Sequence, residues 1–177
     1  MEDDYPIGLY LGNTFSCIGV YRNGGIEIVP NSIGDKITPS AVLIKDDCLN
    51  QIFVGEYATE HLDQFPDISI RQVKRLIGIN KDVPDYKYIL ENIPFKLVEG
   101  KGNNCPYNIE VNVKGKKNIY SPVEITSFII KRLVCNAENY INKGIKKIVM
   151  AVPAYFREEQ KKCLYIQQYY RAWIRLI

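Results

Sequence analysis

Short blocks of apolar residues, separated by polar turns, open the chain and predict three neighbouring β-strands. Apolar runs cover residues 6–11 and 16–21, and a third short run follows at residues 26–29. The polar turn at residues 22–25 contains Asn-Gly, a pair that readily adopts the positive φ angles of a tight hairpin. The N-terminal part is therefore expected to form an antiparallel meander.

The middle of the chain has a weaker pattern, with short apolar runs and several turn residues. A helix is expected at residues 55–65, where Pro66 would end it, and a second helix at residues 69–78. In the second helix Ser69 would serve as the N-cap and Gly78 as the C-cap, since these residue types favour helix ends. Further strands are expected at residues 40–45, 51–54, 95–99, 109–113 and 118–120.

The sequence Ser-Pro-Val-Glu at residues 121–124 is the clearest helix start in the chain. Ser121 can accept hydrogen bonds from free amides, Pro122 suits the first helical position, and Glu124 completes a capping box. Apolar residues then recur at helical spacing, which predicts one buried face, and Gly144 is expected to end the helix. The members of that face are Ile125, Phe128, Ile129, Leu133, Ala137 and Tyr140.

A buried strand is expected next, followed by another helix and an unusual tail. The run at residues 145–152 is apolar and ends at Pro153, and a helix is expected to begin after Phe156. Aromatic and aliphatic residues crowd residues 164–177 without keeping to one face. This atypical tail is therefore expected to remain an exposed apolar patch that does not pack as a helix of the fold.

Composition and charge narrow the class of protein. The chain has 177 residues, enough for one domain with a buried core, and its 46% hydrophobic and 24% charged residues are ordinary for a soluble protein. A net charge of +3, dispersed along the chain, does not favour nucleic acid as a partner. The acidic residues 2–4 do not fit a secretory signal, and no apolar stretch is long enough to span a membrane.

The cysteines and the histidine argue against a disulfide framework and against a zinc site. Five cysteines lie far apart in the sequence, and His61 is the one histidine. No pair of these residues has the spacing of metal ligands, which favours reduced thiols. A cytoplasmic location is expected, with the nucleus as a second location.

The stretch GLYLGNTFSCIGVY at residues 8–21 is the main candidate for chemistry. Its turn contains Gly12, Asn13 and Thr14, which are small or polar and would let the backbone approach an anion. By itself the pattern fits an ordinary hairpin turn better than a phosphate site. The P-loop, the dinucleotide-binding glycine pattern and the Gly-x-Ser-x-Gly elbow of serine hydrolases do not occur in the sequence.

Several segments taken together resemble one family. In order they are IGLYLGNTFSCIGVYRNGGIEIVPNSIGDKITPSAV, VKRLIGI, IPFKLV, YSPVEITSFIIKRL and AVPAYFREEQKK. They closely resemble the N-terminal lobe of the nucleotide-binding domain of the 70-kilodalton heat-shock chaperones (DnaK-like), over about residues 6–162. The motifs KRLIG and VPAYF distinguish this family from actins and sugar kinases.

The resemblance implies an α/β fold, a ribonuclease-H-like or actin-like ATPase lobe with a mixed sheet and flanking helices. It implies that residues 1–177 form an incomplete nucleotide-binding domain, with a smaller subdomain inserted at about residues 40–118 and an atypical tail at residues 164–177. The implied ligand is ATP or ADP with Mg²⁺. The implied partners are co-chaperones (a J-domain protein and a nucleotide exchange factor), and unfolded client proteins through a domain that this sequence does not contain.

The resemblance also assigns the candidate nucleotide-binding residues. Gly12, Asn13, Thr14 and Phe15 would form the first phosphate loop, where the family usually has Gly-Thr-Thr-Tyr, so Asn13 and Phe15 are departures. Lys74 falls on the family's catalytic lysine, which would stabilise charge on the γ-phosphate. From the residues alone, a solvated lysine on a helix face would be the preferred interpretation of Lys74.

Two further residues match allosteric positions of the family. Pro153 falls on its switch proline, although a proline there needs no role beyond ending a strand. Lys161 stands where the family usually has a coupling arginine, and lysine keeps the charge but loses the planar fork of the guanidinium.

Tyr10 is the departure that matters most, because it occupies the position of the family's aspartate that orders Mg²⁺ and its water. A phenol with a pKa near 10 is neutral, whereas Mg²⁺ prefers anionic oxygen, so no metal ligand is expected. The family's second phosphate loop and adenosine site have no counterpart in the sequence. Three hypotheses follow: an ATP-binding molecular chaperone with doubtful ATPase activity, a noncatalytic co-chaperone-binding module, or a degenerate, truncated product without activity.

Overall fold

A mixed β-sheet forms the centre of the computed structural model, which describes residues 7–46, 51–79, 86–102, 105–154, 156–164 and 173–176. The strand order is β12-β11-β1-β2-β3, and the short strand β4 pairs with β2 beside this path. β1 is antiparallel to β2 and parallel to β11, and this confirms the expected meander. The bounds are β1 Ile7–Tyr10, β2 Phe15–Arg22, β3 Gly25–Ile28, β4 Thr38–Pro39, β11 Lys147–Ala151 and β12 Trp173–Leu176.

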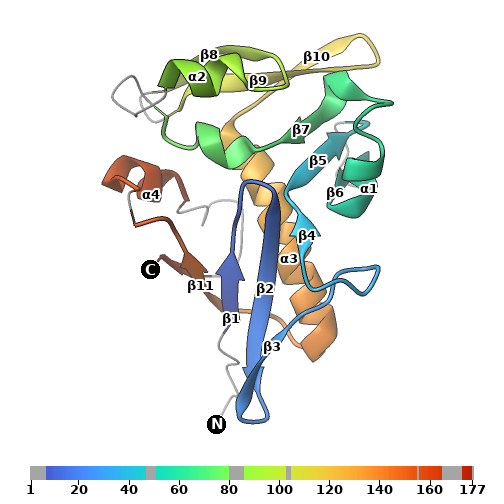
Figure 1. The fold of residues 1–177 in the computed structure, drawn as a ribbon, viewed down its shortest axis with the longest axis vertical. Coiled ribbons are helices and arrows are strands. Elements are labelled where there is room, and N and C mark those ends of the chain that lie inside the picture. The colour runs from blue at the N-terminus through green and yellow to red at the C-terminus, as the bar shows by residue number, and fades with distance from the viewer. Residues whose placement is uncertain are drawn as a thin grey trace.

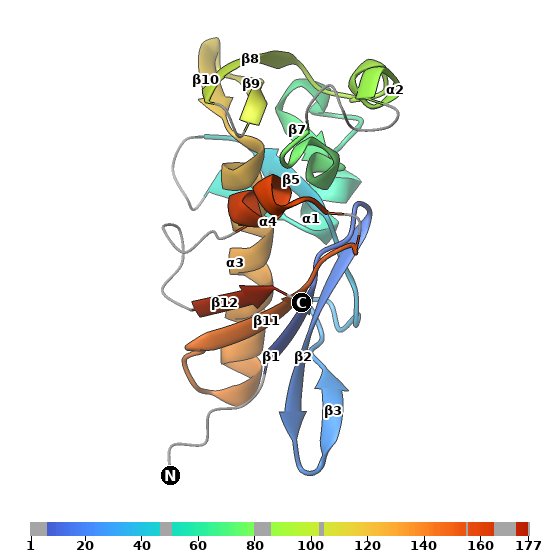
Figure 2. The same ribbon diagram turned by 90° about the vertical axis from the view of Figure 1, so that its left-hand side faces the viewer.

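The long helix α3 (Pro122–Ile141) runs behind the central sheet in Figure 1 and along one side of it in Figure 2. The capping box is present, since the Ser121 hydroxyl accepts from the Glu124 amide and the Glu124 carboxylate accepts from the Ser121 amide. Its apolar side is buried against β2, β5, β6 and β9. The expected end at Gly144 is wrong: the helix ends at Ile141, and Asn142 caps it in the left-handed conformation with φ 53°.

Two small three-stranded sheets lie above the central sheet in Figure 1. The first has the order β6-β5-β7 and is accompanied by the short helix α1 and the 3-10 helix η2. The second has the order β10-β9-β8 and is accompanied by α2. The bounds are β5 Ala41–Ile44, β6 Ile52–Val54, α1 Glu56–Glu60, η2 Pro66–Ile68, β7 Ser69–Arg71, α2 Tyr86–Glu91, β8 Leu97–Gly102, β9 Cys105–Val113 and β10 Lys116–Tyr120.

The predicted helix at residues 69–78 is wrong. Residues 69–71 form β7, and the chain then enters the 3-10 helix η3 (Val73–Leu76). Ile70 is buried opposite Val42 of β5, so pairing with the sheet replaces helical hydrogen bonds. Gln72 adopts the left-handed conformation with φ 57°, which separates the strand from η3. The two expected caps are also wrong: Ser69 lies in β7, and η3 ends at Leu76 with Ile77 as its cap, although Gly78 does have a positive φ of 58°.

Two other expected elements differ in extent. The helix expected at residues 55–65 is helical only over α1, and residues 61–64 form turns. Of the tail at residues 164–177, residues 165–172 and 177 lie outside the described part of the chain. Residues 173–176 form β12, parallel to β11 with Ile174 opposite Ile148, so this stretch extends the sheet instead of remaining unpaired. The helix expected after Phe156 is α4 (Glu158–Leu164).

Candidate functional site

The turn between β1 and β2 carries the candidate phosphate loop. Gly12 is buried, and a Cβ atom at this position would lie 2.1 Å from the Phe15 carbonyl oxygen. Only glycine allows the two backbone segments to approach this closely. Asn13, Thr14 and Phe15 are exposed on the outside of the turn, so the loop is open to a ligand.

Two serines hold the loop from its inner side. The Gly12 amide donates to the Ser16 hydroxyl at 3.2 Å, and the Ser16 and Ser40 hydroxyls lie 2.8 Å apart. The Ser40 amide donates to the Thr14 carbonyl at 2.8 Å. Both serines are buried, so these bonds form away from water and fix the shape of the turn before any ligand binds.

Lys74 reaches the same turn from η3. Its Nζ donates to the Leu11 carbonyl oxygen at 2.6 Å, a contact between residues 63 positions apart. Val73 and Leu76, its neighbours in η3, are buried and anchor the segment, and the tip of β1 and β2 lies beside this segment in Figures 1 and 2. Lys74 is half-buried, and burial lowers the pKa of its ammonium group. The lysine therefore does not lie on a solvated helix face.

Two aromatic rings flank the Lys74 ammonium group. Its Nζ lies 5.8 Å from the ring centre of Tyr10 and 5.6 Å from that of Phe156. Both distances are within the range of cation–π attraction. Phe156 is buried, whereas Tyr10 is 53% exposed at the mouth of the turn. Phe156 is the last residue of the VPAYF motif, but nothing in the sequence assigned it to the site.

Pro153 and Lys161 occupy different positions relative to the loop. Pro153 follows β11, and its carbonyl accepts from the Phe156 amide at 3.0 Å, so this turn places the Phe156 ring near Lys74. Lys161 instead forms an ion pair with Glu158 of the same helix at 2.8 Å, away from the loop among the described residues. The allosteric roles of both residues remain predictions.

Gln160 of α4 is a contact that sequence reasoning missed. Its Nε2 donates to the Ile77 carbonyl at 3.1 Å, and a Cβ at Gly78 would lie 2.6 Å from its Cγ. Helix α4 is thereby tied to the end of the segment that carries Lys74. Gly78 was singled out only as a helix end, and nothing in the sequence pairs this segment with Gln160, because the contact spans 83 positions.

The residues at this turn fit a phosphate group but not Mg²⁺. The side chains placed against it are Tyr10, Ser16, Ser40, Lys74 and Phe156, none of which is a carboxylate. Mg²⁺ is bound in proteins through one or two carboxylates and phosphate oxygens. In the part of the chain that the structure describes, no group of three or more His, Cys, Asp or Glu residues could hold a metal ion. No step through a metal is therefore derived for this chain.

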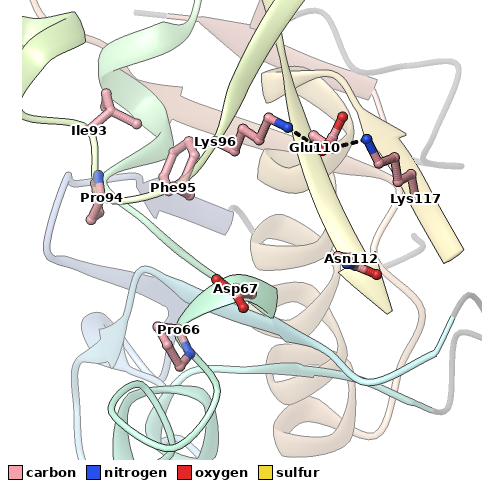
Figure 3. A pocket seen from close by; sticks show the side chains of 9 residues that line it. All are labelled: Pro66, Asp67, Ile93, Pro94, Phe95, Lys96, Glu110, Asn112 and Lys117. Carbon is pink, nitrogen blue, oxygen red and sulfur yellow. Dashed lines mark hydrogen bonds and ion pairs between the residues drawn. The ribbon is translucent and has the colours of Figure 1, made fainter. Parts of the chain in front are cut away.

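A separate pocket of about 570 Å³ lies between η2, the segment before β8, and strands β9 and β10 (Figure 3). Glu110 accepts a hydrogen bond from Lys96 at 2.8 Å and lies 3.7 Å from Lys117. The Lys96 hydrogen bond is the main cause that lowers the pKa of Glu110. Both lysines already engage this carboxylate, so the pocket is a poorer phosphate site than the turn. Its lining is Pro66, Asp67, Ile93, Pro94, Phe95, Lys96, Glu110, Asn112 and Lys117.

No helix in the described ranges is long and apolar enough to cross a bilayer.

A model of the Hsp70 protein family matches residues 6–165. Heat shock cognate 70 kDa protein 3 of Dictyostelium discoideum is 33% identical over 156 residues, which are 88% of this chain and 24% of that protein. The matched part of the chain thus covers about a quarter of the length of this relative. The mixed sheet with its flanking helices is consistent with the actin-like ATPase lobe of that family, and the family match over most of its length shows that the chain belongs to the Hsp70 protein family.

Proposed function

We propose that this chain forms the phosphate-binding part of an Hsp70-type nucleotide site, in a molecular chaperone that assists protein folding. The observation that carries the proposal is the contact of Lys74 with the β1–β2 turn, Nζ to the Leu11 carbonyl at 2.6 Å. An ordinary hairpin would not need a half-buried lysine delivered from another part of the chain. Family membership supports ATP or ADP as the ligand.

Each part of the turn has a role in this proposal. Gly12 lets the backbone approach a phosphate, and the Ser16–Ser40 pair holds the turn in one conformation. Lys74 supplies positive charge beside the turn, in a partly desolvated position where charge interactions are stronger than in water. The proposal needs Lys74 in its protonated form.

We expect weak nucleotide binding by this chain alone and no ATP hydrolysis. The described residues supply contacts to phosphate, and binding energy falls with each contact surface that a complex lacks. The Tyr10 phenol cannot replace the carboxylate through which the family positions Mg²⁺, so Lys74 would bind and orient the phosphates without the metal's contribution.

A second candidate function is a noncatalytic module that binds co-chaperones of the family, such as a J-domain protein or a nucleotide exchange factor. Tyr10 is the observation that favours it, because a neutral ring in the metal position leaves a family fold without its ATPase chemistry. Under this candidate, binding of a co-chaperone would not depend on ATP or on Lys74.

Calorimetric titration of the full chain with ATP tests the first proposal. We expect Lys74→Gln to weaken ATP binding about tenfold or more, since a hydrogen bond to a charged group contributes about 1.5–3 kcal/mol. Lys131→Gln is the matched control, because Lys131 is an exposed residue of α3 and its loss changes the net charge equally. Equal affinity of the Lys74→Gln variant and the unmodified chain would contradict the proposal.

A further inference from the structure

Tyr10 gives the turn a chemical character that differs from a metal-dependent phosphate site. It is the last residue of β1, and its ring lies beside both Gly12 and Lys74. A Cβ on Gly12 would lie 3.1 Å from the Tyr10 Cε1 atom, and the Lys74 Nζ lies 5.8 Å from the centre of its ring. The phenol thus forms one wall of the turn and borders the positive charge.

The contacts that hold Lys74 leave its charge uncancelled. The ammonium group is held by the Leu11 carbonyl and by the faces of two rings, Tyr10 and Phe156. None of these groups carries a negative charge, whereas a carboxylate at position 10 would form an ion pair with Lys74. Among the described residues no carboxylate pairs with Lys74, so its positive charge remains available to an anion that approaches the turn.

We propose that the turn of residues 12–15 and Lys74 bind a polyphosphate chain without a divalent cation, and that Tyr10 is the residue that sets this independence from metal. The inference rests on the proposed function, because it concerns the same site. With a neutral residue at position 10, the described side chains at the turn offer Mg²⁺ no carboxylate to bridge to. Mg²⁺ bound to the polyphosphate only reduces the negative charge that Lys74 attracts, so it weakens binding.

The reverse behaviour follows for a carboxylate at the same position. In Tyr10→Asp the new charge repels a metal-free polyphosphate and pairs with Lys74, so affinity in the presence of a chelator falls by about tenfold. Added Mg²⁺ can then bridge the carboxylate and the phosphate oxygens, and affinity recovers. Tyr10→Phe keeps the ring and its neutrality, so it is the matched control for charge: its affinity in a chelator should stay equal to or higher than that in Mg²⁺, whatever its absolute affinity.

The test is an NMR titration of the ¹⁵N-labelled full chain with sodium tripolyphosphate, with EDTA in one series and excess Mg²⁺ in the other. We expect the loop amides to shift in EDTA with an affinity equal to or higher than that in Mg²⁺. Tyr10→Asp should invert this order, and Tyr10→Phe should not. Binding that requires Mg²⁺ in the unmodified chain would overturn this inference and leave the proposed function standing.

Absence of binding in both series would overturn the proposed function together with this inference. Tripolyphosphate is a suitable probe because it carries the phosphate chain and no adenosine. Should Tyr10→Asp fail to fold, the two series on the unmodified chain still decide the question, since they compare one protein with and without the metal.

Discussion

Replacing Gly12 by alanine should distort the phosphate turn and weaken both stability and ligand binding. The new methyl carbon would lie 2.1 Å from the Phe15 carbonyl oxygen. An ordinary carbon–oxygen contact is about 3.3 Å, so one of the two backbone segments must move by roughly 1.2 Å. Gly12 is buried and its amide is bonded to Ser16, which leaves little freedom for that movement.

The expected cost of Gly12→Ala is about 1–3 kcal/mol of unfolding free energy, as for other overpacked interior positions. For a chain of this size such a loss lowers the melting temperature by roughly 2–12 °C. Because the turn moves away from Lys74, polyphosphate binding should also weaken about tenfold, the effect of losing one hydrogen bond to a charged group. Thermal unfolding and the tripolyphosphate titration measure these two quantities.

Gly8→Ala is the matched control for this substitution. Gly8 lies in β1, the strand that leads into the turn; it is exposed, and a Cβ there would meet no atom within 4 Å. We expect its stability to be unchanged or slightly higher, because alanine restricts the unfolded chain. The reasoning would be refuted if Gly12→Ala and Gly8→Ala melted and bound tripolyphosphate alike.

Three other outcomes are expected. Because burial lowers the pKa of Lys74, phosphate affinity should fall as pH rises through a value below the ordinary lysine pKa of about 10.4, whereas Lys74→Gln should show no such loss. The unfolded chain keeps this proton to higher pH than the folded chain does. The contribution of Lys74 to stability therefore rises with pH between the lowered pKa of the folded chain and the ordinary lysine pKa. Ser121→Ala should cost about 1 kcal/mol in urea unfolding, because it removes the hydroxyl that caps α3, and a cost near zero would count against the capping box. In a fusion that adds the second lobe of a related chaperone, phosphate release from ATP should be undetectable with Tyr10 and measurable with Tyr10→Asp, since a correctly held metal contributes several kcal/mol. Adding Lys74→Ala to the Tyr10→Asp fusion should abolish phosphate release again. Equal rates with Tyr10 and Tyr10→Asp would show that this position is not the metal site.

The elements that were predicted correctly are those whose signals are local. The capping box at residues 121–124 and the 3.6-residue period after it depend on neighbours in sequence, and α3 begins where they indicate. The hairpin between β2 and β3 follows from Asn-Gly, and Asn23 and Gly24 have φ values of 54° and 80°.

The failure at residues 69–78 shows where local signals stop being sufficient. Ile70, Val73 and Leu76 are spaced for a helix, yet they are buried through a strand followed by a 3-10 turn. What decides between the two is the pairing of Ile70 with Val42, a partner 28 positions away that no local pattern reveals. The boundary of the inserted subdomain at about residues 40–118 likewise remains a prediction.

The candidate site was only partly accessible from the sequence. Gly12 and Lys74 were identified through a family resemblance, and their proximity comes from the fold. The Ser16–Ser40 pair and the Phe156 ring could not be foreseen, because each joins segments far apart in the chain with ordinary residue types. Tyr10 was visible as a departure in the sequence, but its position beside the Lys74 ammonium group was not.

Amide chemical-shift mapping of ATP on the full ¹⁵N-labelled chain tests most directly whether the β1–β2 turn and Lys74 form a phosphate site. We expect the largest shifts at residues 10–16 and at Lys74, with Lys74→Gln reducing them and Lys131→Gln leaving them unchanged. Residues of the separate pocket, such as Phe95 and Glu110, should not shift. Shifts centred on that pocket, or no shifts at the turn at millimolar ATP, would contradict the assignment of the phosphate site.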